Sequence, residues 1–130
     1  MKHKMQERSL FEYAVIRVVP RVEREEFINV GVILYCAKQK FLKCLFEIDE
    51  QKFSCFKCEL DKETVLDNLK AIQYICIGIN AGPIGELDLA SRFRWLTATR
   101  STVVQSSKVH PGFCIDADET LNKLFEQLVR

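Results

Sequence analysis

Hydrophobic and polar residues alternate along two early segments of the chain, residues 27–36 and 41–48. Alternation with a period of two is typical of a β-strand that buries one face. The apolar positions of the first segment fall on one face of such a strand: Ile28, Val30, Val32, Leu34 and Cys36. Asn29, Gly31 and Tyr35 fall on the other face. Because only a short polar turn separates the two segments, we expect them to form a β-hairpin.

A third strand is expected before this hairpin, over residues 11–19. The segment is rich in aromatic and β-branched residues and ends at Pro20, which favours a strand followed by a connection. It is almost entirely apolar, which predicts a central place in the sheet. Arg17 is an exception, and it must find a partner or face a cleft, because an unpaired buried charge is costly.

The hydrophobic period then changes to three and four residues over residues 60–79, which predicts an amphipathic helix with Asp61 as its cap and Gly78 at its end. Glycines and a proline follow over residues 78–85 and predict a loop. A short second helix is expected around residues 89–96 and a further strand over 102–106. The last helix begins after the capping residue Asp116.

These elements predict one α+β domain over residues 1–130, with a mainly antiparallel sheet and two to three helices packed on its apolar face. Residues 1–9 are expected to form a mobile tail. A length of 130 residues, 48% hydrophobic and 28% charged, suits a single core and excludes disorder. Since neither a secretion signal nor an apolar run of membrane-spanning length is visible, we expect a cytoplasmic protein and no membrane partner.

The chain has six cysteines, and Cys55 and Cys58 form a single CxxC motif. A zinc site needs four ligands, and no second pair accompanies this motif. In a reducing compartment the cysteines are expected to be free thiols that behave as small apolar residues. We therefore expect no disulfide, no metal and no cofactor.

Catalytic motifs are also missing from the sequence. The glycines of residues 78–85 lack the spacing of a nucleotide-binding loop, and Glu25 and Glu26 are neighbours that point apart in an extended chain. The serines near His110 lie outside any nucleophile motif. The sequence therefore favours a non-enzymatic protein and identifies no catalytic residue, with an enzyme that uses Glu26, His110 or a serine as a remaining alternative.

Charge is unevenly distributed along the chain. The net charge is +1, yet residues 89–115 carry four cations and no acid, so the remainder carries −3. The cations are Arg92, Arg94, Arg100 and Lys108. Trp95, the only tryptophan, lies among them with several hydroxyl residues, a combination that suits a phosphate, carboxylate or single-strand site. The alternative is that these residues have structural roles. Trp95 would then belong to the core, and the arginines would form ion pairs with Glu25, Glu26 or Asp88.

Two motifs, each made of two nearby segments, resemble a known bacterial family. The first motif is YAVIRVVP at residues 13–20 with EFINVGVI at 26–33. The second motif is RFRWLTATRSTVVQ at residues 92–105 with HPG at 110–112. In combination they are similar to the domain-of-unknown-function family numbered 3037, over nearly the whole chain. The family has no assigned activity, so the resemblance implies a fold and a site pattern but no mechanism.

If the two motifs form one site, Arg17, Glu26 and Asn29 should meet five residues of the second motif: Arg92, Trp95, Arg100, Ser101 and Gln105. His110 belongs to the same candidate binding set. Arg17 and Asn29 are expected on the strand face opposite Ile28, Val30 and Val32, and Gly31 should let another segment approach the backbone closely.

The function expected from these observations is that of a small accessory module that binds a protein partner. The resemblance points to a kinase-like protein of the HipA type, because genes of the family often lie beside such kinases. The alternative is a nucleic-acid, nucleotide or anion-binding module that uses the region from Arg92 to Lys108. The sequence does not indicate an oligomeric state.

Overall fold

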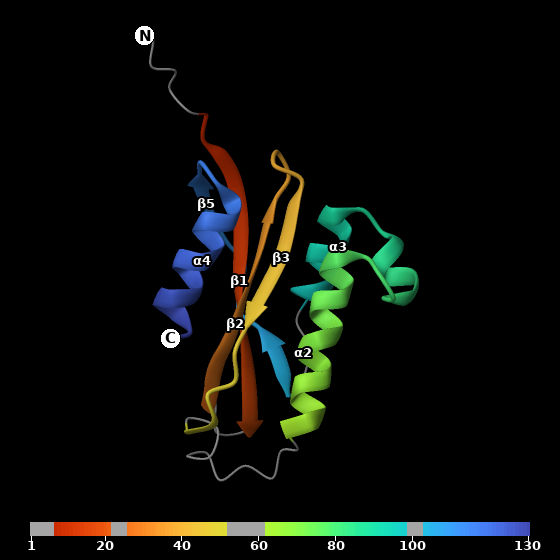
Figure 1. Ribbon diagram of the computed structural model, residues 1–130, viewed down its shortest axis with the longest axis vertical. Coiled ribbons are helices and arrows are strands. Elements are labelled where there is room, and N and C mark those ends of the chain that lie inside the picture. The colour runs from red at the N-terminus through yellow and green to blue at the C-terminus, as the bar shows by residue number, and fades with distance from the viewer. Residues whose placement is uncertain (1–6, 22–25, 52–61, 99–102) are drawn as a thin grey trace.

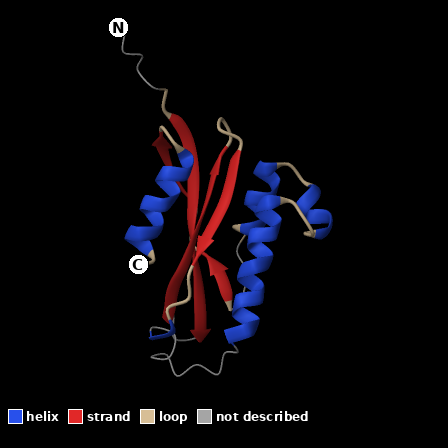
Figure 2. Ribbon diagram, viewed as in Figure 1, coloured by secondary structure: helices blue, strands red, loops and turns tan. Residues whose placement is uncertain are grey.

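The computed structural model describes residues 7–21, 26–51, 62–98 and 103–130, with the backbone alone for residues 20, 21 and 26. Figure 2 shows helices and strands along these segments. The strands are β1 (Ser9–Arg21), β2 (Glu26–Cys36), β3 (Phe41–Phe46), β4 (Val104–Ser106) and β5 (His110–Cys114). The helices are α2 (Lys62–Ile77), the 3₁₀ helix η2 (Gly82–Glu86), α3 (Leu89–Leu96) and α4 (Ala117–Leu128).

The five strands form one antiparallel sheet in the order β3-β2-β1-β4, and β5 also pairs with β1. β5 pairs with the first half of β1, from Ser9 to Tyr13, and β4 pairs with Ile16 to Val18, so the two short strands follow one another along the same edge of β1. The α+β fold, the hairpin of β2 and β3 and the central position of β1 are thus confirmed. β1 begins at Ser9, inside the stretch expected to be a tail.

Helices cover both faces of the sheet, whereas the sequence predicted helices on one apolar face. Figure 1 shows α4 on one side and α2 with α3 on the other. One hydrophobic core lies between the sheet and the helices α2 and α3, and it includes Ile16, Leu69 and Phe93. A second core lies between the sheet and α4, and it includes Leu34 and Phe125. The apolar residues of the central strands therefore point both ways, as in a sheet buried on two sides.

A β-bulge in β2 explains why the predicted face was wrong. Ile16 pairs with Gly31 and Arg17 pairs with Asn29, so Val30 is an extra residue without a partner in β1. An extra residue reverses the alternation of the strand. Ile28 and Val30 consequently pack toward α2 and α3. The remaining predicted positions pack toward α4: Val32, Leu34 and Cys36.

The close approach expected at Gly31 is confirmed. A Cβ atom at this position would lie 2.6 Å from the carbonyl oxygen of Leu45 and 3.1 Å from the Cβ of Phe46, on the neighbouring strand β3. Real Cβ atoms do not approach a backbone oxygen so closely, and only glycine fits there. Gly31 therefore holds the bulged strand against β3.

The helix predictions mostly hold. α2 is followed by Gly78, whose φ of +82° suits a helix-ending glycine, and the Asp61 cap lies outside the described residues. The Asp116 carboxylate accepts a hydrogen bond from the Glu119 backbone N–H at 3.1 Å and caps α4 as predicted.

Two elements were missed: η2 lies where a loop was expected, and β5 contains Pro111 and Gly112, which resemble a turn in the sequence.

Ser107 connects β4 to β5 along the edge of β1. Its backbone N–H donates to the Val15 carbonyl at 2.8 Å, and its Oγ accepts a hydrogen bond from the Val15 N–H, also at 2.8 Å. The serine hydroxyl thus takes the place of a backbone acceptor where the ladder is interrupted. This contact keeps the central strand hydrogen-bonded between its two short neighbours.

Four cysteines within the described segments are free and buried: Cys36, Cys44, Cys76 and Cys114. Burial raises the pKa of the Cys44 thiol well above its ordinary value and that of Cys76 to about 12. Cys55 and Cys58 lie outside the described residues. None of the described helices is both long enough and apolar enough to span a membrane.

Candidate functional site

Three of the candidate residues lie in one row across the sheet. Arg17 on β1 pairs with Asn29 on β2 and with Gln105 on β4, so the three side chains leave the sheet on the same face. We call Arg17, Asn29 and Gln105 the polar row. Asn29 Nδ2 donates to the carbonyl oxygen of Leu128 at 3.1 Å, which places the row beside the end of α4.

The Arg17 side chain is partly buried and stacked on an aromatic ring. Its Cζ lies 4.1 Å from the centroid of the Phe27 ring, which is within cation–π distance. Arg17 Nε is buried and makes no hydrogen bond within the described part of the chain, and the same holds for Asn29 Oδ1. A buried polar atom without a partner typically costs about 1–3 kcal/mol, so this arrangement needs an explanation.

Arg92 has a structural position on α3. Its Nη1 donates to the carbonyl oxygens of Ile75 and Cys76, both at 2.9 Å, and its Nε donates to the carbonyl of Leu87 at 2.9 Å. The last carbonyls of a helix lack partners within it, and a cation there is favourable. Arg92 therefore caps α2 and joins it to α3.

Within the described residues the two motifs meet only in part. Arg92 and Trp95 belong to α3, which packs on the sheet face opposite the side chains of Arg17 and Asn29. Gln105 pairs with Arg17 and also lines a groove together with Trp95. Arg92 is held by the carbonyl oxygens of Ile75 and Cys76, so its guanidinium does not reach the polar row. Arg100, Ser101 and the side chain of Glu26 lie outside the described residues, so their predicted places remain predictions.

His110 also lies apart from the polar row. It is exposed at the start of β5, opposite Tyr13, and the centroids of the two rings are 5.4 Å apart. Tyr13 precedes Arg17 by four residues, which in a strand is about 13 Å. His110 therefore contacts an aromatic neighbour rather than the arginine.

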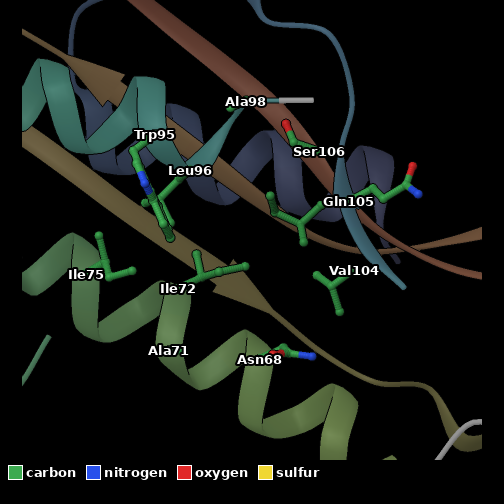
Figure 3. Close-up of a pocket in the computed structure, with 11 residues that line it drawn as sticks. Asn68, Ala71, Ile72, Ile75, Trp95, Leu96, Ala98, Val104, Gln105 and Ser106 are labelled. Carbon is green, nitrogen blue, oxygen red and sulfur yellow. The ribbon is translucent and has the colours of Figure 1, made fainter. Parts of the chain in front are cut away.

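A groove lies between α2, α3 and β4, with a volume of about 270 Å³. Its lining is apolar apart from Asn68, Gln105 and Ser106, and none of the eleven residues that form it is charged: Ile16, Asn68, Ala71, Ile72, Ile75, Trp95, Leu96, Ala98, Val104, Gln105 and Ser106. Figure 3 shows Trp95 reaching from α3 toward α2, whereas the Gln105 side chain extends away from the other labelled side chains. We call this cavity the α2–α3 groove.

Trp95 is 41% exposed, so the only tryptophan of the chain is neither a core residue nor a free surface residue. It forms one wall of the groove. The sequence singled out Trp95 but missed the opposite wall, Asn68, Ala71 and Ile72. Ile72 belongs to the apolar stripe of α2. The sequence predicts such a stripe, but it does not predict which residues of the stripe are left uncovered by the neighbouring helices and strands.

The cations of the basic stretch do not form a cluster within the described residues. Arg92 is bound to backbone carbonyls, while Arg94 and Lys108 are exposed on α3 and between β4 and β5. Asp88 caps α3 by accepting from the Ser91 N–H at 2.7 Å. Hydrogen bonding from the Ser91 side chain, and then from its backbone, lowers the pKa of the Asp88 carboxyl group. The described segments contain no group of three histidine, cysteine or acidic residues that could hold a metal ion.

The sequence matches the model of one protein family, described as Protein of unknown function (DUF3037), over residues 13–129. No curated protein and no solved structure matches the chain. The family match covers all the described strands and helices apart from the start of β1 and contains both candidate regions, the polar row and the groove. The chain belongs to the DUF3037 family.

Proposed function

We propose that the chain is a small accessory module that binds a protein partner through the α2–α3 groove. The observation that carries this proposal is an uncharged, mostly apolar groove of about 270 Å³ with a half-exposed tryptophan in its wall. Tryptophan is one of the residue types enriched among the dominant contacts of protein interfaces. The groove is open to solvent between three elements that are themselves held firmly together.

The size and chemistry of the groove indicate what it takes. A cavity of roughly 150 Å³ lined by apolar side chains accommodates a benzene ring. A groove of about 270 Å³ therefore has room for a large apolar side chain and part of its neighbour. We infer that the partner inserts an aromatic or leucine-like side chain between Ile72 and Trp95, with Asn68 and Ser106 available for hydrogen bonds to its backbone.

The walls of the groove are built to stay in place. Arg92 binds the end of α2 to α3, and Tyr35 of β2 stacks on Phe93 of α3 with the ring centroids 5.4 Å apart. A rigid site loses little conformational entropy when a partner binds. This favours recognition of a preformed shape.

The alternative of a nucleic-acid or nucleotide site in the region from Arg92 to Lys108 finds less support. Such a site needs free cations beside an aromatic plane. Arg92 is bound to α2 carbonyls, and the groove beside Trp95 contains no charged lining residue. The narrower expectation of a HipA-type kinase partner rests on the family resemblance alone.

Affinity purification of the tagged protein at its native level, followed by mass spectrometry, tests the proposal when wild type is compared with Ala71→Arg. Ala71 is exposed on α2 and lines the groove, and arginine is a good helix former, so the substitution fills the groove without disturbing the fold. Gln127→Arg adds the same charge at an exposed position of α4 and serves as the matched control.

We expect one stoichiometric partner with wild type and with Gln127→Arg, and its loss with Ala71→Arg. The identity of that partner decides the narrower expectation of a kinase. Retention of the partner by Ala71→Arg, or the absence of any stoichiometric partner with wild type, would contradict the proposal.

A further inference from the structure

Arg17 and Asn29 of the polar row lie on the sheet face opposite the α2–α3 groove and have a chemistry of their own. Figure 1 shows α4 beside the half of the sheet that contains β5. The row lies at the other end of that helix, where Asn29 Nδ2 reaches the carbonyl oxygen of Leu128. Arg17 and its neighbour Phe27 keep part of their surface open to solvent there, and Phe27 is 46% exposed.

The unused atoms of the row are one donor and one acceptor. Arg17 Nε carries an N–H that is buried and unpaired within the described residues, and Asn29 Oδ1 is a buried acceptor in the same condition. Arg17 of β1 and Asn29 of β2 are direct partners in the sheet, and the Cα atoms of such partners lie about 4.5–5.5 Å apart. Both atoms are buried, so a ligand that both accepts and donates hydrogen bonds here would satisfy them once the surrounding side chains have moved to admit it.

The guanidinium of Arg17 supplies the donors that such a ligand needs. Its Cζ lies 4.1 Å from the centroid of the Phe27 ring, and a planar guanidinium offers its Nε–H and a neighbouring Nη–H side by side to two oxygens of one oxyanion. No carboxylate of the described residues forms an ion pair with Arg17, so its charge is not balanced there. Gln105 borders the arginine on the opposite side from Asn29.

Two acidic residues lie beyond Asn29 and bear on the electrostatics. Glu47 and Asp49 line a cavity of about 320 Å³ with Asn29 and the end of α4. The Glu47 carboxylate is bound by Arg130, whose Nη2 lies 3.0 Å from Oε1. Asp49 accepts a hydrogen bond from the Gln51 N–H at 2.9 Å. The Glu47 charge is therefore balanced by a cation, which limits its repulsion of an anion at Arg17.

We propose that the polar row binds a phosphate group that keeps one hydroxyl. Arg17 donates to two phosphate oxygens through Nε and Nη, and Asn29 Oδ1 accepts the hydrogen bond of the phosphate hydroxyl. An acceptor beside an arginine selects phosphate over sulfate, because sulfate has no hydroxyl at neutral or mildly acidic pH and would leave Asn29 Oδ1 unpaired.

The test is a titration of the ¹⁵N-labelled protein observed through the arginine Nε–H signals. The Arg17 signal is identified by its loss in Arg17→Lys. The titrants are inorganic phosphate, sulfate and O-phosphoserine, each at the same ionic strength and at about pH 5.5, where phosphate and its monoesters carry a hydroxyl. Arg94→Lys, at an exposed arginine on α3, is the matched control.

We expect phosphate to shift the Arg17 signal with a saturable, millimolar dissociation constant, and sulfate to bind about tenfold more weakly. Phe27→Leu keeps the arginine but removes its platform, so phosphate should bind more weakly to that variant even if Arg17→Lys fails to fold. Arg94→Lys should bind like wild type. Saturation by O-phosphoserine would show that the site takes a phosphate attached to a larger molecule, whereas saturation by inorganic phosphate alone would show that it takes the free ion.

Two results would overturn the proposal. One is an Arg17 signal that does not saturate with phosphate. The other is an equal response to phosphate and sulfate, which reports general screening of the charge instead of a built site.

Discussion

Arg92 and Cys76 are joined by a hydrogen bond of 2.9 Å, from a guanidinium Nη1 on α3 to a carbonyl oxygen in the last turn of α2. The same nitrogen donates to Ile75, and the Nε donates to Leu87 just before α3 begins. One arginine thus terminates one helix and anchors the start of the next. Because α2 and α3 form the two walls of the groove, this arginine also sets the shape of the proposed binding site.

We expect Arg92→Met to lower the free energy of unfolding by about 2–3 kcal/mol, because several hydrogen bonds to a charged donor are lost and buried carbonyls are left unpaired. Arg94→Met, at an exposed position two residues along the same helix, should change it by less than about 0.5 kcal/mol. Urea denaturation of the purified variants measures both. Equal effects of the two substitutions would show that Arg92 is an ordinary surface residue.

Ser107→Ala should destabilise the protein by about 1–2 kcal/mol, because the Val15 N–H loses its acceptor in the central strand. Ser107→Thr keeps the hydroxyl and should have a smaller effect. Amide hydrogen exchange gives the local readout: the Val15 amide should exchange faster in Ser107→Ala than in wild type. An unchanged exchange rate would mean that the hydroxyl does not complete the ladder.

The buried thiol of Cys76 predicts a loss of stability at alkaline pH. Its pKa rises from 9.0 to about 12 in the folded protein because of burial. Below pH 9 the Cys76 thiol is protonated in both the folded and the unfolded protein, and its contribution to the free energy of unfolding is fully present. Between pH 9 and 12 the unfolded chain releases a proton that the folded chain retains, so the free energy of unfolding falls, by up to about 1.4 kcal/mol per pH unit.

Cys76→Ala should therefore have a flatter pH dependence than wild type, measured by urea denaturation between pH 8 and pH 10. The buried Cys44 acts in the same direction in both proteins, since burial is the main cause of its raised pKa. The smaller contribution of Cys76 to that pKa is lost in Cys76→Ala, which flattens the pH dependence further. Parallel curves for wild type and Cys76→Ala would contradict the role given to this thiol.

Trp95→Ala should weaken binding of the purified partner about tenfold to a hundredfold, because a tryptophan in an interface commonly contributes more than about 1 kcal/mol. Its effect on folding should be smaller, since the side chain is 41% exposed. Phe113→Ala removes an aromatic ring that is 67% exposed on β5, and it should leave the affinity unchanged. Calorimetric titration of each variant with the partner measures these affinities.

Much of the fold could be predicted because local patterns decide it. The hairpin of β2 and β3 follows from alternation and a polar turn, and α4 follows from the Asp116 cap and an apolar stripe. The bulge at Val30 could not be predicted, because counting by twos assumes a regular strand. β5 was missed because Pro111 and Gly112 resemble a turn when the edge on which they lie is unknown.

The candidate site was predictable only in part. Arg17, Asn29 and Gln105 were singled out, and the strand register brings them together. Arg92 is indistinguishable in the sequence from a binding arginine, because its three acceptors belong to residues that only the packing of α2 against α3 brings near. Ala71 carries no chemical signal, and its importance comes entirely from the space beside it.

The most direct test of partner binding at the groove is site-specific photo-crosslinking in cells. A benzophenone amino acid replaces Ala71 in the groove or, as the control, Gln127 on the far face of the molecule. The proposed function predicts one discrete adduct with a second protein from position 71 and none from position 127. Adducts of equal yield from both positions, or from position 127 alone, would contradict it.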